Sequence, residues 1–338
     1  MITSASTPST APDQSPTAVA VGILQDAQHR ILVARRPASS HQGGKWEFPG
    51  GKIQPGESVP GALERELHEE LGIHVCVSRP LLRVVHHYPD RSVLLDVWRV
   101  LDYQGEAQGR EGQPLQWVPL RELDQLDLPD ADRPILRALE LPPLYVISDV
   151  TRFGTVEFLS RLERVLRAGS RLVQLREPTL PAAEYRSLAR TVVGTARRFG
   201  AKVLLNAEPS WAEDCDADGV HLSSHRLMTL ERRPLAAKYL VAASCHDEAE
   251  LRQAAKIGAD FAVLSPVRAT RSHPHAIPLG WEEFARLRMA SDIPVYALGG
   301  LSADNLEEAR LAGAAGLAMI RGVWEADSIE EAVGKLCA

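Results

Sequence analysis

The sequence predicts two domains of different architecture, an α+β domain with a mixed sheet followed by an α/β (β/α)₈ barrel, with the boundary near residue 142. Three observations favour this division. The 338 residues suffice for two domains. The stretch before residue 142 combines short strand-like runs with one strong helical pattern. The stretch after it alternates regularly between apolar β-rich runs and helical segments.

The N-terminal part divides into a tail and a domain. Residues 1–16 are rich in Ser, Thr, Pro and Ala and lack the basic and apolar regions of a signal peptide, so a disordered tail is expected. For the domain, residues 17–141, Ser58 is suited to cap a helix and Gly72 to end it. The predicted helices cover residues 58–71 and 134–139, and the predicted strands 19–24, 30–34, 93–100 and 115–119.

The C-terminal domain, residues 142–338, contains eight β-rich runs with helical stretches between most of them. Eight such units predict a closed barrel, although the length is near the lower end for that fold. A doubly wound sheet is the alternative if two runs are not strands. The expected strands cover residues 144–148, 171–175, 202–206, 219–222, 240–244, 261–265, 294–298 and 316–320.

Composition excludes some classes of function. The net charge of −6 argues against a general nucleic-acid binder, which needs basic surfaces to neutralise phosphates. No apolar run is long enough to span a bilayer. The four cysteines form no CxxC pair and no zinc-ligand spacing, which is typical of reduced thiols. A cytoplasmic protein without a membrane or direct nucleic-acid partner is expected.

A strong motif lies in residues 51–73, GKIQPGESVPGALERELHEELGI. Glu66, Glu69 and Glu70 are spaced to share one helix face. Their mutual repulsion favours a divalent cation, and hard oxygen ligands suit Mg²⁺, with Mn²⁺ as a substitute. Arg65 is one turn before Glu69 and is expected to pair with it. A solvated acidic helix is the alternative interpretation, and a catalytically inactive scaffold is another.

The motif resembles the Nudix box at every specified position. Flanking segments at residues 18–23, 35–36, 45–53, 88–91, 111–114 and 127–129 resemble the MutT type, the 8-oxo-dGTP diphosphatases, over about residues 17–140. The resemblance implies metal ligation by Gly50, Glu57, Glu66, Glu69, Glu70 and Glu111. It implies catalytic roles for Arg65, Glu66, Glu69, Glu70 and Glu111, and substrate contacts from Arg36, Phe48, Tyr88, Arg91 and Asp132.

One position departs from that pattern. The family's guanine-reading asparagine is replaced by Asp132. An amide both donates and accepts hydrogen bonds, whereas an ionised carboxylate only accepts them. Three interpretations remain open: Asp132 is protonated, it reads donors only, or it shares a proton with Asp130. The choice of base is therefore open, while hydrolysis of the phosphate chain is not affected.

Distinctive segments occur at residues 144–149, 173–177, 205–206, 217–222, 243–246, 264–267, 297–301 and 316–318. Through them, residues 144 to about 325 resemble the thiamin phosphate synthase/TenI family over nearly the whole domain. The synthase's lysine after Arg-Glu is Pro178 here, its two magnesium-binding aspartates are Ala207 and Arg226, and its later lysine is His273. The synthase chemistry is therefore expected to be lost. Candidate positions that remain are His246, for proton transfer, and a ligand- or phosphate-binding set comprising Gln174, Arg176, Asn206, Gly299, Gly300 and Arg321.

Three functions follow as hypotheses. The first is a Nudix hydrolase that converts 8-oxo-dGTP to 8-oxo-dGMP and pyrophosphate, a step in nucleotide-pool sanitation and DNA repair. The second is a thiamin-pathway enzyme that hydrolyses thiamin-type pyrophosphates, with the barrel as a thiazole phosphate tautomerase or ligand-binding module. The third makes the barrel a sensor, a dimerisation module or a structural relic. A nucleotide is the expected partner, together with a phosphate-bearing barrel ligand and, in the third case, a second copy of the chain.

Overall fold

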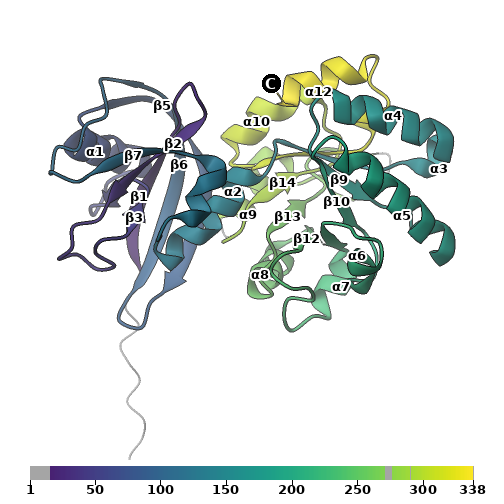
Figure 1. The fold of residues 1–338 in the computed structure, drawn as a ribbon, viewed down its shortest axis with the longest axis horizontal. Helices are drawn as coiled ribbons and strands as arrows, with labels where there is room; N and C mark the ends of the chain where they lie inside the picture. The colour runs from purple at the N-terminus through teal and green to yellow at the C-terminus, as the bar shows by residue number, and fades with distance from the viewer. Residues whose placement is uncertain (1–15, 271–275, 290, 338) are drawn as a thin grey trace, which may run out of the picture.

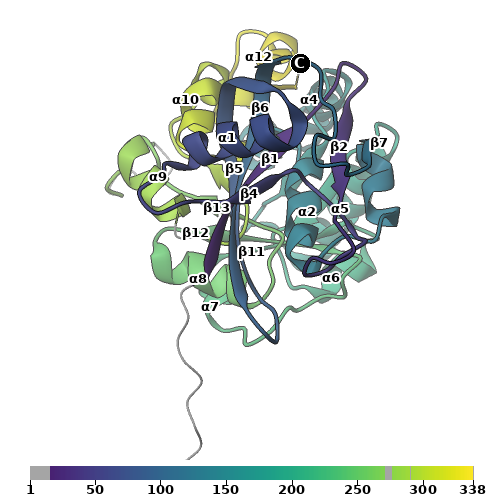
Figure 2. The same cartoon turned by 90° about the vertical axis from the view of Figure 1, so that its left-hand side faces the viewer.

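The computed structural model describes residues 16–270, 276–289 and 291–337 (Figure 1). The expected tail therefore lies outside the described residues except for residue 16, and so does His273. The described chain forms two parts that lie side by side, with the C-terminal barrel behind the N-terminal domain when viewed from the latter's side (Figure 2).

Two sheets form the N-terminal domain. A four-stranded mixed sheet has the order β4-β1-β6-β5, and a three-stranded antiparallel sheet has the order β3-β2-β7. The central pair β1 and β6 is parallel, and the outer pairs are antiparallel. The strands are β1 (Thr17–Leu24), β2 (Arg30–Arg35), β3 (Trp46–Glu47), β4 (Gly50–Lys52), β5 (His74–His87), β6 (Ser92–Gln104) and β7 (Leu115–Pro119).

Helices cover both faces of the mixed sheet. The helix α1 (Val59–Leu71) packs its buried leucines in one core with Ala20 and Leu24 of β1. The helix α2 (Arg133–Glu140) packs in the other core with Val21 and Ile23. Successive residues of a strand point to opposite faces, so β1 supplies both cores. Two 3₁₀ turns, η1 (Leu120–Gln125) and η2 (Asp130–Asp132), lead from β7 to α2.

The C-terminal domain is a closed barrel of eight parallel strands in the order β10-β11-β12-β13-β14-β15-β8-β9. Closure excludes the doubly wound alternative. The strands are β8 (Leu144–Ile147), β9 (Leu172–Leu175), β10 (Lys202–Leu205), β11 (Gly219–Leu222), β12 (Leu240–Cys245), β13 (Phe261–Leu264), β14 (Val295–Ala297) and β15 (Gly316–Met319).

Helices surround this barrel. The longer ones are α4 (Thr155–Arg167), α5 (Ala182–Arg197), α8 (Glu248–Lys256), α9 (Gly280–Met289) and α12 (Ile329–Cys337). The shorter ones are α3 (Val150–Phe153), α6 (Ser210–Asp214), α7 (Ser224–Met228), η3 (Ala303–Asn305), α10 (Leu306–Leu311) and α11 (Arg321–Trp324). Within the described residues, no helix is both long and apolar enough to cross a membrane.

The predicted fold classes are confirmed for both domains. All eight barrel strands lie within one residue of the expected bounds. The N-terminal prediction was incomplete, because it missed β3, β4 and the long strand β5. The register of β5 against β6 shifts at three points, and the strand contains Pro80, which cannot donate a ladder hydrogen bond. These irregularities remove the alternating pattern by which strands are recognised.

The N-terminal domain docks on the barrel face at which the strands begin. Pro142 of the linker accepts a hydrogen bond from Tyr296 Oη at 2.5 Å. Arg137 of α2 forms an ion pair with Asp260, which directly precedes β13. Arg83 of β5 donates to the Met289 carbonyl oxygen at 3.1 Å. The opposite face, where the strands end and barrel enzymes carry their active sites, stays uncovered by the N-terminal domain.

Candidate active sites

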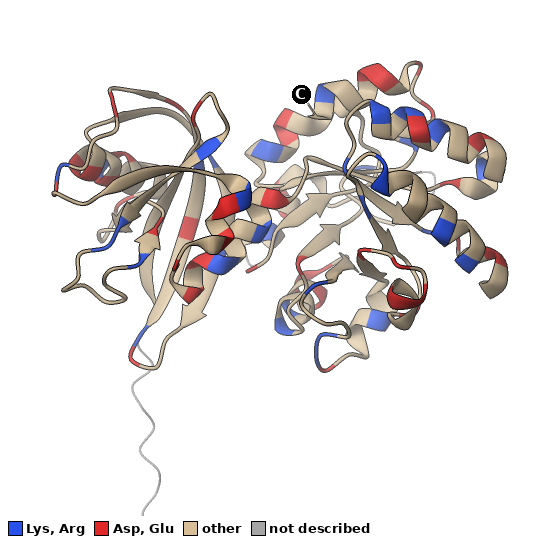
Figure 3. Cartoon of the chain, in the orientation of Figure 1, with Lys and Arg blue, Asp and Glu red and all other residues tan. Residues whose placement is uncertain are grey.

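The acidic motif lies on α1. The Ser58 side chain caps this helix by accepting a hydrogen bond from the Gly61 N–H at 3.2 Å. Gly72 ends it with a φ of 74°, a left-handed conformation that glycine adopts without steric cost. The buried face consists of Ala62 and three leucines, which leaves Glu66, Glu69 and Glu70 off that face. Figure 3 shows acidic residues on the α1 ribbon.

Arg65 contacts three carboxylates. The expected ion pair with Glu69 is confirmed, at 3.5 Å. The guanidinium also binds both oxygens of Glu57 at 2.9 Å and reaches Glu66 at 2.8 Å, two contacts that the prediction did not include. The guanidinium fork matches a carboxylate in two parallel bonds, which favours Glu57. These bonds from Arg65, together with the Gln54 N–H, lower the Glu57 pKa to about 2.

The loop before α1 approaches the carboxylates closely. The Gly50 N–H donates to Glu70 Oε2 at 3.1 Å. A Cβ at Gly51 would lie 2.1 Å from Glu66 Oε2, so a larger residue here would displace the Glu66 carboxylate. Burial, together with the charges of Glu47, Glu66 and Glu111, raises the Glu70 pKa to about 8 despite the opposing Gly50 bond. Glu70 is therefore a carboxyl group in crowded acidic surroundings.

These donors fit a divalent cation. They are hard oxygen atoms, which Mg²⁺ prefers, and a cation would relieve the repulsion that raises the Glu70 pKa. Among the described residues, no three His, Cys, Asp or Glu side chains converge as a preformed cage. Arg65 instead engages Glu57 and Glu66. Glu111 is exposed, and its N–H binds the Gln113 side chain at 2.9 Å.

A second carboxyl group lies buried away from this helix. Asp132 is 6% exposed and receives a hydrogen bond from the Phe48 N–H. Burial raises the Asp132 pKa to about 8, and the Glu47 charge adds to this. Arg36 and the Phe48 bond oppose the shift. The raised pKa favours the protonated form of Asp132, the first of the three sequence interpretations.

Arg36 and Glu47 link Asp132 to the acidic site. They form an ion pair with each other, and Arg36 Nε also donates to the His41 carbonyl oxygen at 2.8 Å. The charge of Glu47 acts on both Asp132 and Glu70. The predicted phosphate contact Arg36 therefore lies beside the predicted base pocket.

Tyr88 and Arg91 differ in their placement. Tyr88 Oη accepts a hydrogen bond from the Ala131 N–H at 3.4 Å, next to Asp132. Its ring packs edge-on against His41, with centroids 4.8 Å apart. Arg91 is half exposed and pairs with its neighbour Asp90 at 3.1 Å. Tyr88 thus lies at the pocket, whereas no described contact brings Arg91 to Asp132.

The barrel's candidate histidine is oriented by a carboxylate. His246 directly follows β12, and its Nδ1 lies 2.9 Å from Glu250 Oε2. The same oxygen accepts the His246 N–H at 2.7 Å, while Ser224 Oγ bonds the other oxygen. A histidine fixed through Nδ1 keeps Nε2 available for proton transfer.

Two neighbouring hollows lie at the ends of β8, β9, β14 and β15. The larger, about 390 Å³, is lined by Asp149, Arg176, Arg321 and seven other residues. The smaller, about 60 Å³, is lined by Gly299, Gly300 and Arg321 among others. Arg321 Nη2 donates to Thr270 Oγ1 at 3.1 Å. The structure therefore brings four of the predicted ligand residues to one rim.

Gln174 and Asn206 instead form hydrogen bonds with other residues of the barrel. Gln174 is 1% exposed and donates to Tyr145 Oη at 3.1 Å. Asn206 donates to the His221 carbonyl oxygen at 3.0 Å. Burial and the Arg176 charge lower the His221 pKa to about 3, so this histidine is neutral. The two predicted residues thus have barrel hydrogen-bond partners in this structure.

Comparisons with known proteins match each half separately. A model of the NUDIX domain matches residues 20–138, and a model of thiamine monophosphate synthase matches residues 144–323. The 8-oxo-dGTP diphosphatase of Escherichia coli K12 is 39% identical over 122 residues, covering 36% of this chain and 95% of that protein. The chain belongs to the Nudix and thiamine monophosphate synthase families.

Two further relatives bear on the sites. The CTP pyrophosphohydrolase of Escherichia coli K12 is 42% identical to the Nudix half over 118 residues, 35% of this chain and 87% of that protein. A putative thiamine-phosphate synthase 2 of Aquifex aeolicus is 37% identical over 182 residues, 54% of this chain and 97% of the relative. The N-terminal half is thus a Nudix-type hydrolase with relatives of different base specificity.

The two positions at which the synthase family has magnesium-binding aspartates contact each other here. The Arg226 guanidinium donates to the Ala207 carbonyl oxygen and forms an ion pair with Glu208. A fixed positive charge at that place opposes a cation. The geometry agrees with the expectation that the synthase metal site is absent.

Sequence reasoning missed Glu47 and Glu250. Glu47 stands in the segment that resembles the MutT type, but its link to Arg36, Asp132 and Glu70 arises from four separate parts of the chain. Glu250 follows His246 by four residues on the adjacent helix turn, a spacing that could have indicated the pair.

Proposed function

We propose that the Nudix half is a Mg²⁺-dependent nucleoside triphosphate pyrophosphohydrolase, with Mn²⁺ as a substitute, that converts 8-oxo-dGTP to 8-oxo-dGMP and pyrophosphate. The main support is the pairing of a crowded carboxylate site on α1 with a separate buried carboxyl group, Asp132, whose raised pKa favours the protonated form. Such an enzyme would remove an oxidised nucleotide before it enters DNA.

The residues of the Nudix site have different proposed roles in the reaction. Glu57, Glu66, Glu69 and Glu70, with the Gly50 carbonyl and Glu111, would hold the metal, which supplies charge neutralisation on the phosphate chain. Arg65 holds Glu57 and Glu66 in place through ion pairs, and it lowers the Glu57 pKa. One of the carboxylates, Glu70 or Glu111, would accept the proton of the attacking water. Catalysis then rests on positioning and electrostatics.

The base would be read by Asp132 and Phe48. A protonated carboxyl group offers one donor and one acceptor, as an amide does. 8-Oxoguanine presents an acceptor at O6 beside a donor at N7–H, so the two edges are complementary. Tyr88, beside Ala131, would pack against the base, and Arg36 would bind phosphate.

Cytosine nucleotides are the second candidate substrate. A carboxylate accepts a hydrogen bond from the cytosine N4 amino group. The 42% identity to a CTP pyrophosphohydrolase gives this candidate a specific basis. The thiamin-type pyrophosphates of the second sequence hypothesis remain the third.

A substrate panel with Mg²⁺ tests this proposal. We expect the wild-type chain to hydrolyse 8-oxo-dGTP with a higher kcat/KM than dGTP, CTP or thiamin pyrophosphate. Glu70→Gln should lower kcat by about 100-fold or more, because it removes a metal-site carboxylate. The matched control is Glu64→Gln on the exposed side of the same helix.

The outcomes separate the candidates. A preference for CTP would assign the site to cytosine nucleotides, and a preference for thiamin pyrophosphate would assign it to the thiamin pathway. Equal loss of activity in Glu64→Gln and Glu70→Gln would contradict the assignment of the metal site.

For the barrel, the oriented His246 favours an acid–base function on a phosphate-bearing ligand, such as tautomerisation of a thiazole phosphate. Isomerisation of that compound, followed by NMR, should occur with the wild-type chain and be lost in His246→Gln. Absence of both binding and turnover in the wild type would leave the barrel with a non-catalytic role.

A further inference from the structure

The short helix α2 touches both halves of the molecule. Asp132, the candidate base-reading residue, directly precedes its first turn, and Arg137 lies in its second turn. The two positions are separated by about 8 Å along the helix axis. Ile135, Ala138 and Leu139 bury the opposite side of α2 in the Nudix core. One side of α2 thus supports the nucleotide site, and another reaches the barrel.

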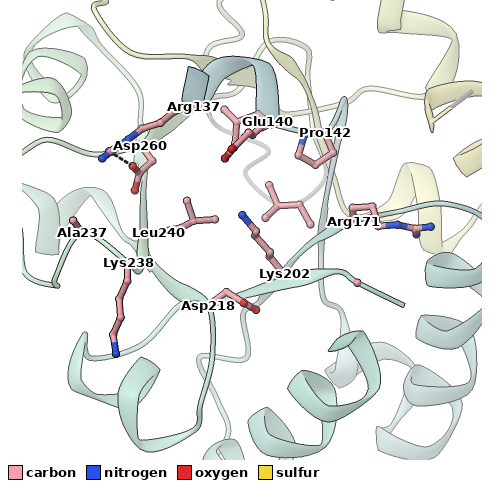
Figure 4. Close-up of a pocket in the computed structure, with 13 residues that line it drawn as sticks. Arg137, Glu140, Pro142, Arg171, Lys202, Asp218, Ala237, Lys238, Leu240 and Asp260 are labelled. Carbon is pink, nitrogen blue, oxygen red and sulfur yellow. Dashed lines mark hydrogen bonds and ion pairs between the residues drawn. The ribbon is translucent and has the colours of Figure 1, made fainter. Parts of the chain in front are cut away.

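The barrel presents a preformed acceptor to Arg137. Asp260 is buried, and its Oδ2 accepts hydrogen bonds from Arg233 at 2.6 Å and from the Val241 N–H at 2.7 Å. Its other oxygen, Oδ1, is left for Arg137 of the Nudix half. Figure 4 shows this pair among the residues that line a cavity of about 430 Å³, which α2, the linker and the barrel share.

This contact matters because α2 has little stability of its own. It has eight residues, and no side chain caps its N-terminus by a hydrogen bond. Helices of this length depend on tertiary contacts. The Arg133–Asp130 pair near its start is exposed on both sides and contributes little. Within the described contacts of α2, the bond to Asp260 is therefore the charged link that fixes the helix to a rigid barrel.

We propose that Arg137 is a positioning residue through which the barrel holds α2, and hence Asp132, in register with the Phe48 backbone, so that the barrel sets the base selectivity of the Nudix site. This inference rests on the proposed function of Asp132. It gives the barrel a role in the first reaction that is independent of any barrel activity.

Removal of Arg137 isolates this link. Asp260 keeps Arg233 and the Val241 N–H, so its buried charge remains paired within the barrel. Arg137 itself is half exposed, so truncation leaves no cavity in either core. The metal site on α1 belongs to a different helix and makes no described contact with Arg137.

The experiment uses the full-length chain and compares Arg137→Ala, Arg137→Lys and the matched control Arg133→Ala. Steady-state kinetics are measured for the preferred nucleotide and for its nearest competitor. We expect Arg137→Ala to raise KM for the preferred nucleotide roughly three- to tenfold, with kcat within about twofold, because a small misplacement of a binding group weakens binding. Discrimination between the two bases should fall by a similar factor. Arg137→Lys should restore part of it, and Arg133→Ala should resemble the wild type.

A second measurement does not depend on the substrate. Amide hydrogen exchange should accelerate in α2 of Arg137→Ala and stay unchanged in α1. Unchanged exchange in α2, or an unchanged KM and base ratio, would overturn the inference. A wild-type enzyme without any base preference would refute the proposed function instead. In that case, a raised KM with faster exchange in α2 would still support the positioning role.

Discussion

At the scale of single residues, the Nudix site is dominated by carboxyl groups that folding buries close to one another. Burial raises the pKa of Glu47, Glu70 and Asp132, in the last two cases to about 8. Arg36 opposes the shifts at Glu47 and Asp132, whereas Arg65 pairs with Glu57 and lowers the Glu57 pKa. The site thus contains more carboxyl groups than arginines. Its α1 carboxylates are suited to bind cations, and its Asp132 pocket is suited to bind a polar base.

Asp132 makes stability depend on pH in an unusual direction. Its pKa is raised from 3.8 to about 8, so between these values the folded chain binds the proton that the unfolded chain releases. The contribution of Asp132 to stability is therefore full below pH 4 and is lost as the pH rises towards about 8. Asp132→Asn should abolish the contribution of Asp132 to the slope of the free energy of unfolding against pH.

The measurement is the melting temperature at pH 5.5 and at pH 8.5 for both proteins. Relative to the wild type, Asp132→Asn should gain a few degrees in melting temperature between the lower and the higher pH. A difference between the two proteins that stays constant with pH would mean that Asp132 is ionised throughout. That result would turn attention to cytosine as the preferred base.

At the scale of elements, the sequence was most informative where burial is continuous. The barrel strands were located to within one residue because each is a short apolar run between helices. The helix α1 was located through its cap and its Gly72 end. The strand β5 was not, because shifts of register and Pro80 break its pattern.

The candidate sites could likewise be predicted from the sequence only in part. The acidic residues of the motif could be named because they share one helix, where spacing alone sets the geometry. The pair of Arg65 with Glu69 was predicted from the same spacing, but the shorter pair with Glu57 was not, since Glu57 lies in the preceding loop. The raised pKa of Asp132 depends on Glu47, Arg36 and Phe48, which only tertiary structure brings together.

At the scale of the whole molecule, each half has a buried carboxylate that interacts with an arginine of the other half. Asp260 of the barrel receives Arg137 from the Nudix half. Conversely, Asp96 of β6 is buried near Arg288 of the barrel, which is itself 3% exposed, and also pairs with Arg83 at 3.4 Å. Burial lowers the Arg288 pKa to about 10, and the Asp96 charge opposes that shift. Each half therefore contributes to the charge balance of the other.

These charge interactions between the two halves predict that the halves unfold together. We expect calorimetry of the full chain to show one transition. Asp96→Asn should lower its stability by about 1–3 kcal/mol, because it removes the carboxylate that pairs with Arg83 and whose charge acts on the buried Arg288 guanidinium. The control Glu122→Gln, in an exposed pair with Arg121, should change stability by less than about 1 kcal/mol. Two transitions in the wild type, with only one shifted in the variant, would contradict the coupling.

The position of β8 also has a consequence during protein synthesis. This first barrel strand pairs with β9 and with β15, the last of the barrel strands in chain order, so the barrel cannot close until β15 has been synthesised. At the usual rates of elongation, the Nudix half leaves the ribosome roughly 10 to 40 seconds before β15. During that interval Arg137 and Asp96 have no barrel to face, and the nascent enzyme acquires its final α2 contacts only when the last strand is in place.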